Sequence, residues 1–354
     1  MAKKKKTLPK DFREILDAKD FESFKKVFDT CEIDARGGYG KTTALSFYRI
    51  PNDFVRWLVA QGADLEAVDN YKRTALHDQA SIRGGDVSVF LELGANVNAV
   101  DTYGATPLHF ATGHGFNVDA VKKLIEYGAN VKAVDDYEQT PLESALSNAR
   151  NMDLQALAKI SSILLSADYN ITQKMKDAVI KKGEDFEFHR ENFNKDYLQE
   201  TEQALDQLYK IFDVPPVKRR LMHDGVSPIK VNGTTWQEQY EALWELLIPS
   251  SGSAKTVQGE VVRIAGKVRD EIHRNGGGNW NADFKKMLDA FGLHLKTENS
   301  LATADLEKAD LIIKDIRKNG DGDDYELHFL CELATKWVLK NPNPVRLEKL
   351  AYKK

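Results

Sequence analysis

The stretch Thr106-Pro107-Leu108-His109 decides the fold, because it recurs along the first half of the chain. Its relatives are spaced by 31, 32 and 34 residues and begin at Thr43, Thr74 and Thr140. A second motif, Gly-Ala-Asp/Asn, keeps the same register and begins at Gly62, Gly94 and Gly128. Two motifs in one register are hard to obtain by chance, so the first half is built from an internal repeat.

The residues of one unit predict two helices. Thr106 is a good helix cap, and Pro107 suits the first helical position, where its missing N–H costs nothing. Leu108 and Ala111 then fall on the face that packs inward. The glycine of the second motif ends the second helix, because glycine tolerates the positive φ that a helix end often needs. Each unit is therefore a pair of helices followed by a turn.

At these residues the sequence resembles the ankyrin repeat family, whose unit is a hairpin followed by two antiparallel helices. The register weakens towards both ends, as terminal repeats with a polar outer face require. Thr30-Cys31-Glu32-Ile33-Asp34-Ala35 occupies the Gly-Ala-Asp register, which predicts a capping helix pair over Asp11–Phe28. The resemblance implies an ankyrin repeat domain over residues 11–170, with an N-cap and about four repeats, after a basic tail over residues 1–10.

From residue 171 onward the repeat disappears and amphipathic patterns take its place. Apolar residues at helical spacing predict helices over Leu198–Phe212, Trp236–Leu247, Val257–Arg274, Phe284–Phe291, Ala302–Lys318 and Tyr325–Leu339. Helices with such short connections predict a bundle-like domain over residues 171–354. The predicted fold class is all-α: an ankyrin-repeat solenoid followed by a C-terminal helical bundle-like domain.

Composition narrows the function classes. The net charge of -4, from 50 basic and 54 acidic residues, provides no surplus of lysine and arginine for nucleic acid. No stretch reaches the roughly 18 apolar residues of a membrane helix, and Lys3–Lys6 is followed by no apolar signal core. Cys31 and Cys331 have no metal-ligand spacing. We expect a cytoplasmic protein without cofactor or metal, and without nucleic acid or membrane as partner.

The resemblance implies a protein-binding module without catalysis, because ankyrin stacks hold partners with their hairpin tips and first helices. Tyr71, Tyr103 and Tyr137 each precede the repeat threonine by three residues, and Tyr39 stands one position earlier in the first copy. Tyrosine offers a rigid ring with a polar tip and is enriched in interface hot spots. These tyrosines are predicted to contact a partner. Alternatively, each packs on its neighbouring hairpin and stabilises the stack.

Other residues near the tyrosines extend the predicted site. Asp69, Asp101 and Asp135 place carboxylates beside the rings, which suits a partner with a basic surface. Phe110 and His114 are further candidates on or near the first helices. His77 and His109 are expected to be structural, since the motif histidine of the resembled family bonds across the hairpins.

Two patterns resemble ligand sites but lie in the wrong context. Ala35–Thr42 satisfies a loose phosphate-loop pattern, but it follows a helix end and lies in a hairpin, whereas a true phosphate loop follows a buried strand. The acidic turn Asn319–Asp324 lacks the alternating ligands and distal glutamate of a calcium loop. We expect neither to bind its ligand.

Three functional hypotheses follow. The preferred one is an intracellular adaptor or inhibitor, and the combination of a compact stack with a helical domain also looks like bacterial ankyrin-containing proteins, among them toxin-neutralising immunity proteins. The alternative is an enzyme in which His223, Asp224, Glu260 or His273 perform acid–base chemistry in the C-terminal domain. Turn capping by Asp224 and a surface position of His273 explain two of these residues without catalysis. The third hypothesis is self-association through the tyrosines.

Overall fold

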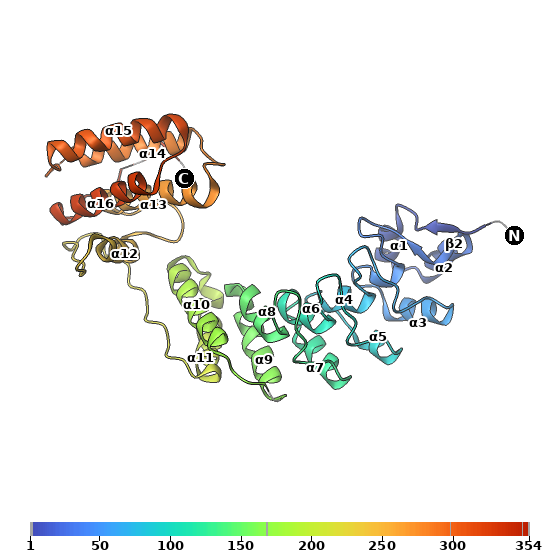
Figure 1. Ribbon diagram of the computed structural model, residues 1–354. Helices are drawn as coiled ribbons and strands as arrows, with labels where there is room; N and C mark the ends of the chain where they lie inside the picture. The colour runs from blue at the N-terminus through green and yellow to red at the C-terminus, as the bar shows by residue number, and fades with distance from the viewer. Residues whose placement is uncertain (1–2, 168, 298, 349, 353–354) are drawn as a thin grey trace. The chain divides into compact units, whose positions relative to one another are not determined.

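The computed structural model describes residues 3–167, 169–297, 299–348 and 350–352, and it confirms the all-α fold class. The chain forms two compact units (Figure 1). The repeat unit comprises residues 1–184 and 195–217, and the C-terminal unit comprises residues 185–194 and 218–354. The first unit therefore continues beyond residue 170, where the repeats are predicted to end.

The predicted basic tail contains a short strand. β1 (Lys5–Thr7) pairs in parallel with β2 (Cys31–Arg36), and its side chains are exposed. Leu8 is buried, and its N–H donates to the carbonyl of Arg36. Lys4 Nζ donates to the carbonyl of Phe28. The predicted basic tail is therefore held against β2 by one apolar anchor and the backbone pairing, while the side chains of β1 stay exposed to solvent.

The predicted capping pair is present as α1 (Phe12–Asp17) and α2 (Phe21–Thr30). Rings of Phe12, Phe24 and Phe28 pack against one another, and Phe24 stacks on Phe54 of the next helix with ring centroids 4.1 Å apart. The remaining elements of the stack are η1 (Ala44–Ser46), α3 (Asn52–Ala60), α4 (Ala75–Ala80), α5 (Ser88–Glu92), α6 (Pro107–Gly113), α7 (Val118–Glu126), α8 (Pro141–Asn148), η2 (Asn151–Asp153) and α9 (Leu154–Leu165).

Threonine begins the first helix of each good repeat, as predicted. Thr74, Thr106 and Thr140 form capping boxes with the residue three positions later, and Pro107 and Pro141 occupy the first helical turn. In the weak first repeat, Ser46 stands where the other copies have histidine or glutamate, and only the 3₁₀ turn η1 forms. A serine side chain is too short to reach back to the cap amide, which explains the weakness of this copy.

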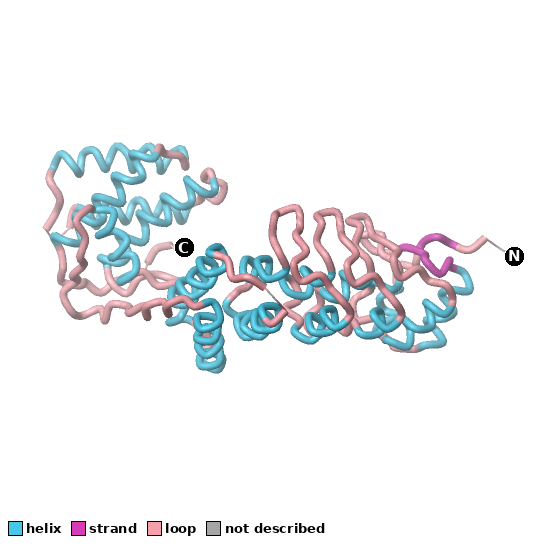
Figure 2. The backbone as a smooth tube through the Cα atoms, turned by 60° about the horizontal axis from the view of Figure 1, so that its bottom comes forward, coloured by secondary structure: helices cyan, strands magenta, loops and turns pink. Residues whose placement is uncertain are grey.

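The second motif performs the turn that the glycines predict. Gly62, Gly94 and Gly128 have φ values of 93°, 91° and 86°, a region that suits glycine. Hairpins follow these glycines and stand side by side along one face of the helix layers (Figure 2). Successive hairpins are joined at their bases, where the amides of Asp64, Asn96 and Asn130 donate to side chains of the preceding repeat.

The repeat unit ends with α11 (Lys195–Phe212) and with α10 (Gln173–His189) as far as Glu184. α11 packs on α9, and α10 precedes it through η3 (Arg190–Asn192). Lys182 Nζ on α10 donates to the carbonyls of Ser147 and Ala149, so α10 covers the end of α8. This helix pair closes the apolar end that the last repeat would otherwise expose.

The C-terminal unit is a helical core of five helices, which the apolar patterns predict closely. They are α12 (Trp236–Leu247), α13 (Val257–Asn275), α14 (Ala282–Leu295), α15 (Thr303–Asn319) and α16 (Asp324–Lys340). α13 is the central helix, and it contacts α12, α14 and α16. Gly266 of α13 is required by packing, because a Cβ there would lie 2.2 Å from the Trp244 ring. Cys331 lies in this core, as predicted.

Among the helices of the described residues, none combines the length and apolarity that crossing a membrane demands.

Candidate functional site

Each hairpin is held by its aspartate. Asp69 Oδ1 accepts the N–H groups of Tyr71 and Arg73 at 2.7 and 2.9 Å. Asp101 and Asp135 accept from the residues two and four positions later in the same way, at 2.8 to 3.0 Å. Asp69 and Asp101 are buried. Two of the three carboxylates predicted beside the rings are therefore largely buried, because one oxygen of each side chain folds back onto its own turn.

The motif histidines are structural, as predicted. Nδ1 of His77 and of His109 accepts the N–H of Thr74 and of Thr106, each at 3.1 Å. Nε2 then lies 3.1 Å from a carbonyl of the next hairpin, that of Ala105 or of Gln139. Burial lowers the pKa of His77 to about 4 and also lowers that of His109, so both rings are neutral at pH 7.

These turns present the three tyrosines along one face. Tyr71, Tyr103 and Tyr137 are 41%, 47% and 67% exposed. Rings of Tyr103 and Tyr137 stack with centroids 6.1 Å apart. Stacking of Tyr103 on Tyr137 agrees with the packing interpretation for these two residues, and contact with a partner stays a prediction that the exposure of all three side chains permits.

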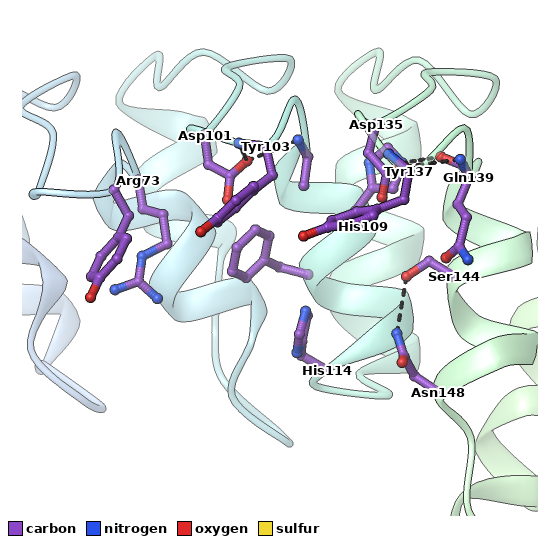
Figure 3. A pocket seen from close by; sticks show the side chains of 13 residues that line it. Arg73, Asp101, Tyr103, His109, His114, Asp135, Tyr137, Gln139, Ser144 and Asn148 are labelled. Atoms are coloured by element: carbon purple, nitrogen blue, oxygen red, sulfur yellow. Dashed lines mark hydrogen bonds between the residues drawn. The ribbon is translucent and has the colours of Figure 1, made fainter.

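The tyrosines overhang a pocket of about 500 Å³ between the hairpins and the first helices (Figure 3). Seven of the nine sequence-predicted site residues line it: Tyr71, Tyr103, Tyr137, Asp101, Asp135, Phe110 and His114. Asp69 does not line it. Tyr39 does not line it either, and at 94% exposure it stands at the tip of the first hairpin. The structure thus brings together residues from three successive repeats.

The floor of the pocket is aromatic on one side and polar on the other. Phe110 packs on His77 and His114, with ring centroids 5.3 and 5.1 Å apart. Burial lowers the pKa of His114, which favours its neutral form. Asn148 Nδ2 donates to Ser144 Oγ at 3.3 Å. A mainly aromatic cavity with a few polar groups is suited to holding a side chain of a partner.

Arg73 lies at one end of the pocket and was not predicted from the sequence. Its Nε and Nη2 bind Asp69 Oδ2 at 3.0 and 2.7 Å, and its guanidinium lies 5.1 Å from the centroid of the Tyr71 ring. Asp78 is 3.9 Å away on α4, and burial raises the pKa of this carboxyl to about 6. Aligning the repeats could have singled out Arg73, because Ala105 and Gln139 occupy the same position in the next two repeats and only the first copy carries a charge there.

Ser144, Asn148 and Gln139 also line the pocket without having been predicted. Ser144 and Asn148 lie one turn apart on α8, beside Gly113 of α6. A Cβ on Gly113 would lie 2.5 Å from Ser144 Oγ, so the close approach of these two helices fixes the polar side of the pocket. Nothing in the repeat pattern distinguishes these polar residues from others on the surface of α8.

The four residues of the enzyme hypothesis occupy ordinary structural positions. Asp224 accepts from Val226, Ser227 and the Ser227 hydroxyl, so it caps its own turn, and His223 Nδ1 lies 3.6 Å from it. His273 Nε2 lies 3.4 Å from exposed Asp324. Glu260 is fully buried and paired with Arg263. None of the four lines the pocket beneath the tyrosines or the groove of about 510 Å³ beside Tyr352.

The phosphate-loop pattern Ala35–Thr42 begins in strand β2, so the expectation that it follows a helix end is wrong, whereas its place in a hairpin is confirmed. Gly37 and Thr42 exchange backbone hydrogen bonds in a hairpin, which contains the glycines of the phosphate-loop pattern. Asp323 at the end of the acidic turn caps α16 in a capping box with Glu326. Across the part of the chain that the structure describes, no group of three or more His, Cys, Asp or Glu side chains is arranged to hold a metal ion.

Comparison with known families agrees with the geometry. A family model described as ankyrin repeats in three copies matches residues 43–135 and, in an overlapping second match, residues 79–174. The first half of the chain thus contains ankyrin repeats, which are protein–protein interaction modules, and the whole of the pocket lies within the matched residues. No curated protein matches the chain.

Proposed function

We propose that this protein is a non-catalytic adaptor or inhibitor that holds a protein partner in the pocket formed by Tyr71, Tyr103 and Tyr137. The observation that carries the proposal is the placement of three half-exposed aromatic rings on turns that are already fixed. Because each turn is tied by its aspartate, the rings lose little conformational entropy on binding. Pre-organised aromatic side chains over a concave surface are typical of interface hot spots.

A cytoplasmic location remains part of this proposal. Cys31 and Cys331 are free and buried, which agrees with a reducing compartment. Whether the bound partner is merely recruited or is inhibited, as by a toxin-neutralising immunity protein, is decided by assaying the activity of the partner with and without this protein.

The test begins with affinity capture from source-cell lysate on the immobilised full chain. Any retained protein is identified and purified, and its affinity is measured for three variants. Tyr103→Ala and Tyr137→Ala should each weaken binding about tenfold or more, the loss expected for a hot-spot aromatic. Tyr127→Ala is the matched control, because Tyr127 is 46% exposed at the end of α7 and does not line the pocket.

The stability of the variants must be measured alongside. Both pocket tyrosines are half exposed, so their truncation should change the free energy of unfolding by about 0.5 kcal/mol or less. Equal weakening by Tyr127→Ala, or unchanged binding by the two pocket variants, would place the interface elsewhere and reject the proposal. Charge reversal of Asp69, Asp101 or Asp135 does not serve as a test, because it would also break the turns.

A further inference from the structure

Three aligned hairpins differ at one position in a way that points to a ligand. Each has an aspartate, a tyrosine two residues after it, and a third residue, which differs between the hairpins, four residues after the aspartate. That third residue is Arg73 in the first hairpin, Ala105 in the second and Gln139 in the third. The first hairpin therefore contains a guanidinium group that the other two lack.

Arg73 shows what the shared residues can hold. Oδ1 of Asp69 accepts the two backbone N–H groups of the turn, and Oδ2 accepts Nε and Nη2 of the guanidinium. The same guanidinium lies over the ring of Tyr71. One carboxylate oxygen and one tyrosine face thus form a seat for an arginine side chain, combining a charge-assisted fork with a cation–π contact.

The next two hairpins have the same aspartate and tyrosine, but no arginine of the hairpin occupies the seat between them. Oδ1 of Asp101 and of Asp135 accepts the turn amides as in the first hairpin. Among the described residues, the second oxygen of each has no hydrogen-bond partner and forms no ion pair. Asp101 is 7% exposed, and both carboxylates face the pocket beneath Tyr103 and Tyr137 (Figure 3). Neither second oxygen is among the fully buried atoms without a partner, so both are accessible from the pocket, and Asp101, the more buried carboxylate, gains most from a cationic partner.

Charge in the pocket favours a cation over an anion. Arg73 is the only cationic side chain among the described lining residues, and Asp69 already holds it. His109 and His114 are neutral at pH 7 because burial lowers the pKa of each. Asp78 and Asp101 also lie close enough to raise the pKa of Arg73, so a single cation faces several carboxylates. An acidic ligand would find no free positive group on this surface.

We infer that the partner inserts arginine side chains into the seats formed by Asp101 with Tyr103 and by Asp135 with Tyr137, where they take the position that Arg73 takes on Asp69 and Tyr71. This inference rests on the proposed function and names the chemistry of its site. Arginine is preferred to lysine because a planar guanidinium binds a carboxylate with two donors while it stacks on a ring. The occupant is therefore an arginine-bearing segment of a protein partner.

The test uses the full chain and the capped peptide acetyl-Gly-Arg-Gly-amide, with the same peptide carrying citrulline as a neutral isostere. Ring signals of labelled tyrosine are followed by NMR, and Tyr103 and Tyr137 are assigned with Tyr→Phe variants, which keep the ring. The arginine peptide should shift both signals saturably and more weakly at high salt. The citrulline peptide should bind about tenfold more weakly or not at all.

Two variants turn the internal comparison into a direct test. The double substitution Ala105→Arg with Gln139→Arg fills both seats from within and should reduce peptide affinity about tenfold or more. Arg73→Ala should open a third seat, so that Tyr71 begins to respond. Arginine already occupies this position in the first hairpin and alanine occupies it in the second, so each variant introduces a residue that one of the three hairpins carries. Circular dichroism checks that the variants fold.

Three results would overturn the inference: no saturable shift with the arginine peptide, equal shifts with the citrulline peptide, or unchanged affinity after both seats are filled with arginine. Failure of the proposed function looks different. If the arginine peptide binds but no protein partner depends on Tyr103 and Tyr137, the seat exists and the adaptor or inhibitor function is rejected. If a partner depends on these tyrosines but the arginine peptide does not bind, only the chemistry of the occupant is rejected.

Discussion

The two units are stabilised in opposite ways. In the repeat unit, the motif histidines link neighbouring copies about one repeat apart, from His77 to Ala105 and from His109 to Gln139, and Arg83 binds Asp153, 70 positions away. In the C-terminal unit, the corresponding contacts span most of the domain. Gln258 Nε2 donates to the carbonyls of Asn341 and Asn343, and Tyr352 donates to Glu260 across 92 positions.

The C-terminal unit contains an ion pair in which both members are buried, whereas Arg73, Arg83 and Arg150 of the repeat unit stay partly exposed when they bind the buried carboxylates of Asp69 and Asp153. Arg263 binds both oxygens of Glu260, at 2.8 and 2.6 Å, and both side chains are at most 1% exposed. Tyr352 and the N–H of Ala254 supply two further hydrogen bonds to Glu260. Among the described residues, Nη1 of Arg263 has no hydrogen-bond partner. Such a network holds the C-terminal segment in place but depends on every member.

These two patterns of contacts predict how well each unit tolerates substitutions. A solenoid sums nearest-neighbour terms, so the loss of one contact is felt by two repeats and leaves the surface free to vary. A domain closed by one buried charged network loses much of its stability when a single member is removed. The proposed partner-binding surface lies on the repeat unit, which is the unit expected to tolerate such changes.

The largest loss of stability is expected when the Glu260–Arg263 ion pair of the C-terminal unit is broken. Glu260→Ala leaves the Arg263 charge buried and unpaired, which should cost the C-terminal unit about 3–5 kcal/mol. Tryptophan fluorescence in urea reports this unit, because four of the five tryptophans lie in it. Lys255→Ala is the control, since Lys255 pairs with Glu191 on the surface and should cost less than about 1 kcal/mol. Equal costs for the two variants would contradict the prediction.

A smaller effect is expected at the link between repeats. His109→Ala leaves the buried amide of Thr106 and the carbonyl of Gln139 without their partner, at a cost of about 2–3 kcal/mol. Glu143→Ala removes a cap of the same type without a described bond to a following hairpin, so about 1 kcal/mol is expected. Hydrogen exchange of α6 and α8, read by mass spectrometry, separates the two. Equal protection losses would show that the cross-repeat bond contributes little.

The smallest effect is a pH dependence of the repeat unit. The folded state holds His77 neutral with a pKa of about 4, whereas the unfolded chain binds a proton below about 6.5. Stability from His77 is therefore present above pH 6.5 and lost as pH falls, by about 2 kcal/mol between pH 7 and 5. His109 and His114, whose pKa values are also lowered, act in the same direction.

Asp78 opposes this trend and provides the control. Its folded pKa of about 6 lies above the ordinary value, so its contribution is lost as pH rises through 6. Asp78→Asn should therefore make the fall in stability between pH 7 and 5 steeper than in the parent, and His77→Gln should make it shallower. Urea unfolding followed by hydrogen exchange of α4 measures both slopes. Parallel curves for all three proteins would show that these groups do not set the pH dependence.

The sequence by itself determined the features that depend on local or periodic residues. The features of the repeat act within one copy or between adjacent copies, as the threonine caps, glycine turns and motif histidines do. Their regular spacing therefore predicted the ankyrin stack. Apolar periodicity likewise predicted α12 to α16 to within a few residues. The exposed tyrosines were found because one position in each copy carries the same residue.

Which polar side chains are paired, and which remain available to a partner, follows from the tertiary structure alone. It turned Asp69 and Asp101 onto their own hairpins, placed Arg73 on Asp69 and brought Ser144 and Asn148 to the pocket. It also paired β1 with β2 and joined Glu260, Arg263 and Tyr352. These contacts depend on which side chain satisfies which donor after packing, and on pairs that lie far apart in the chain. Neither leaves a periodic signal in the sequence, because each occurs once and is selected by distance and burial.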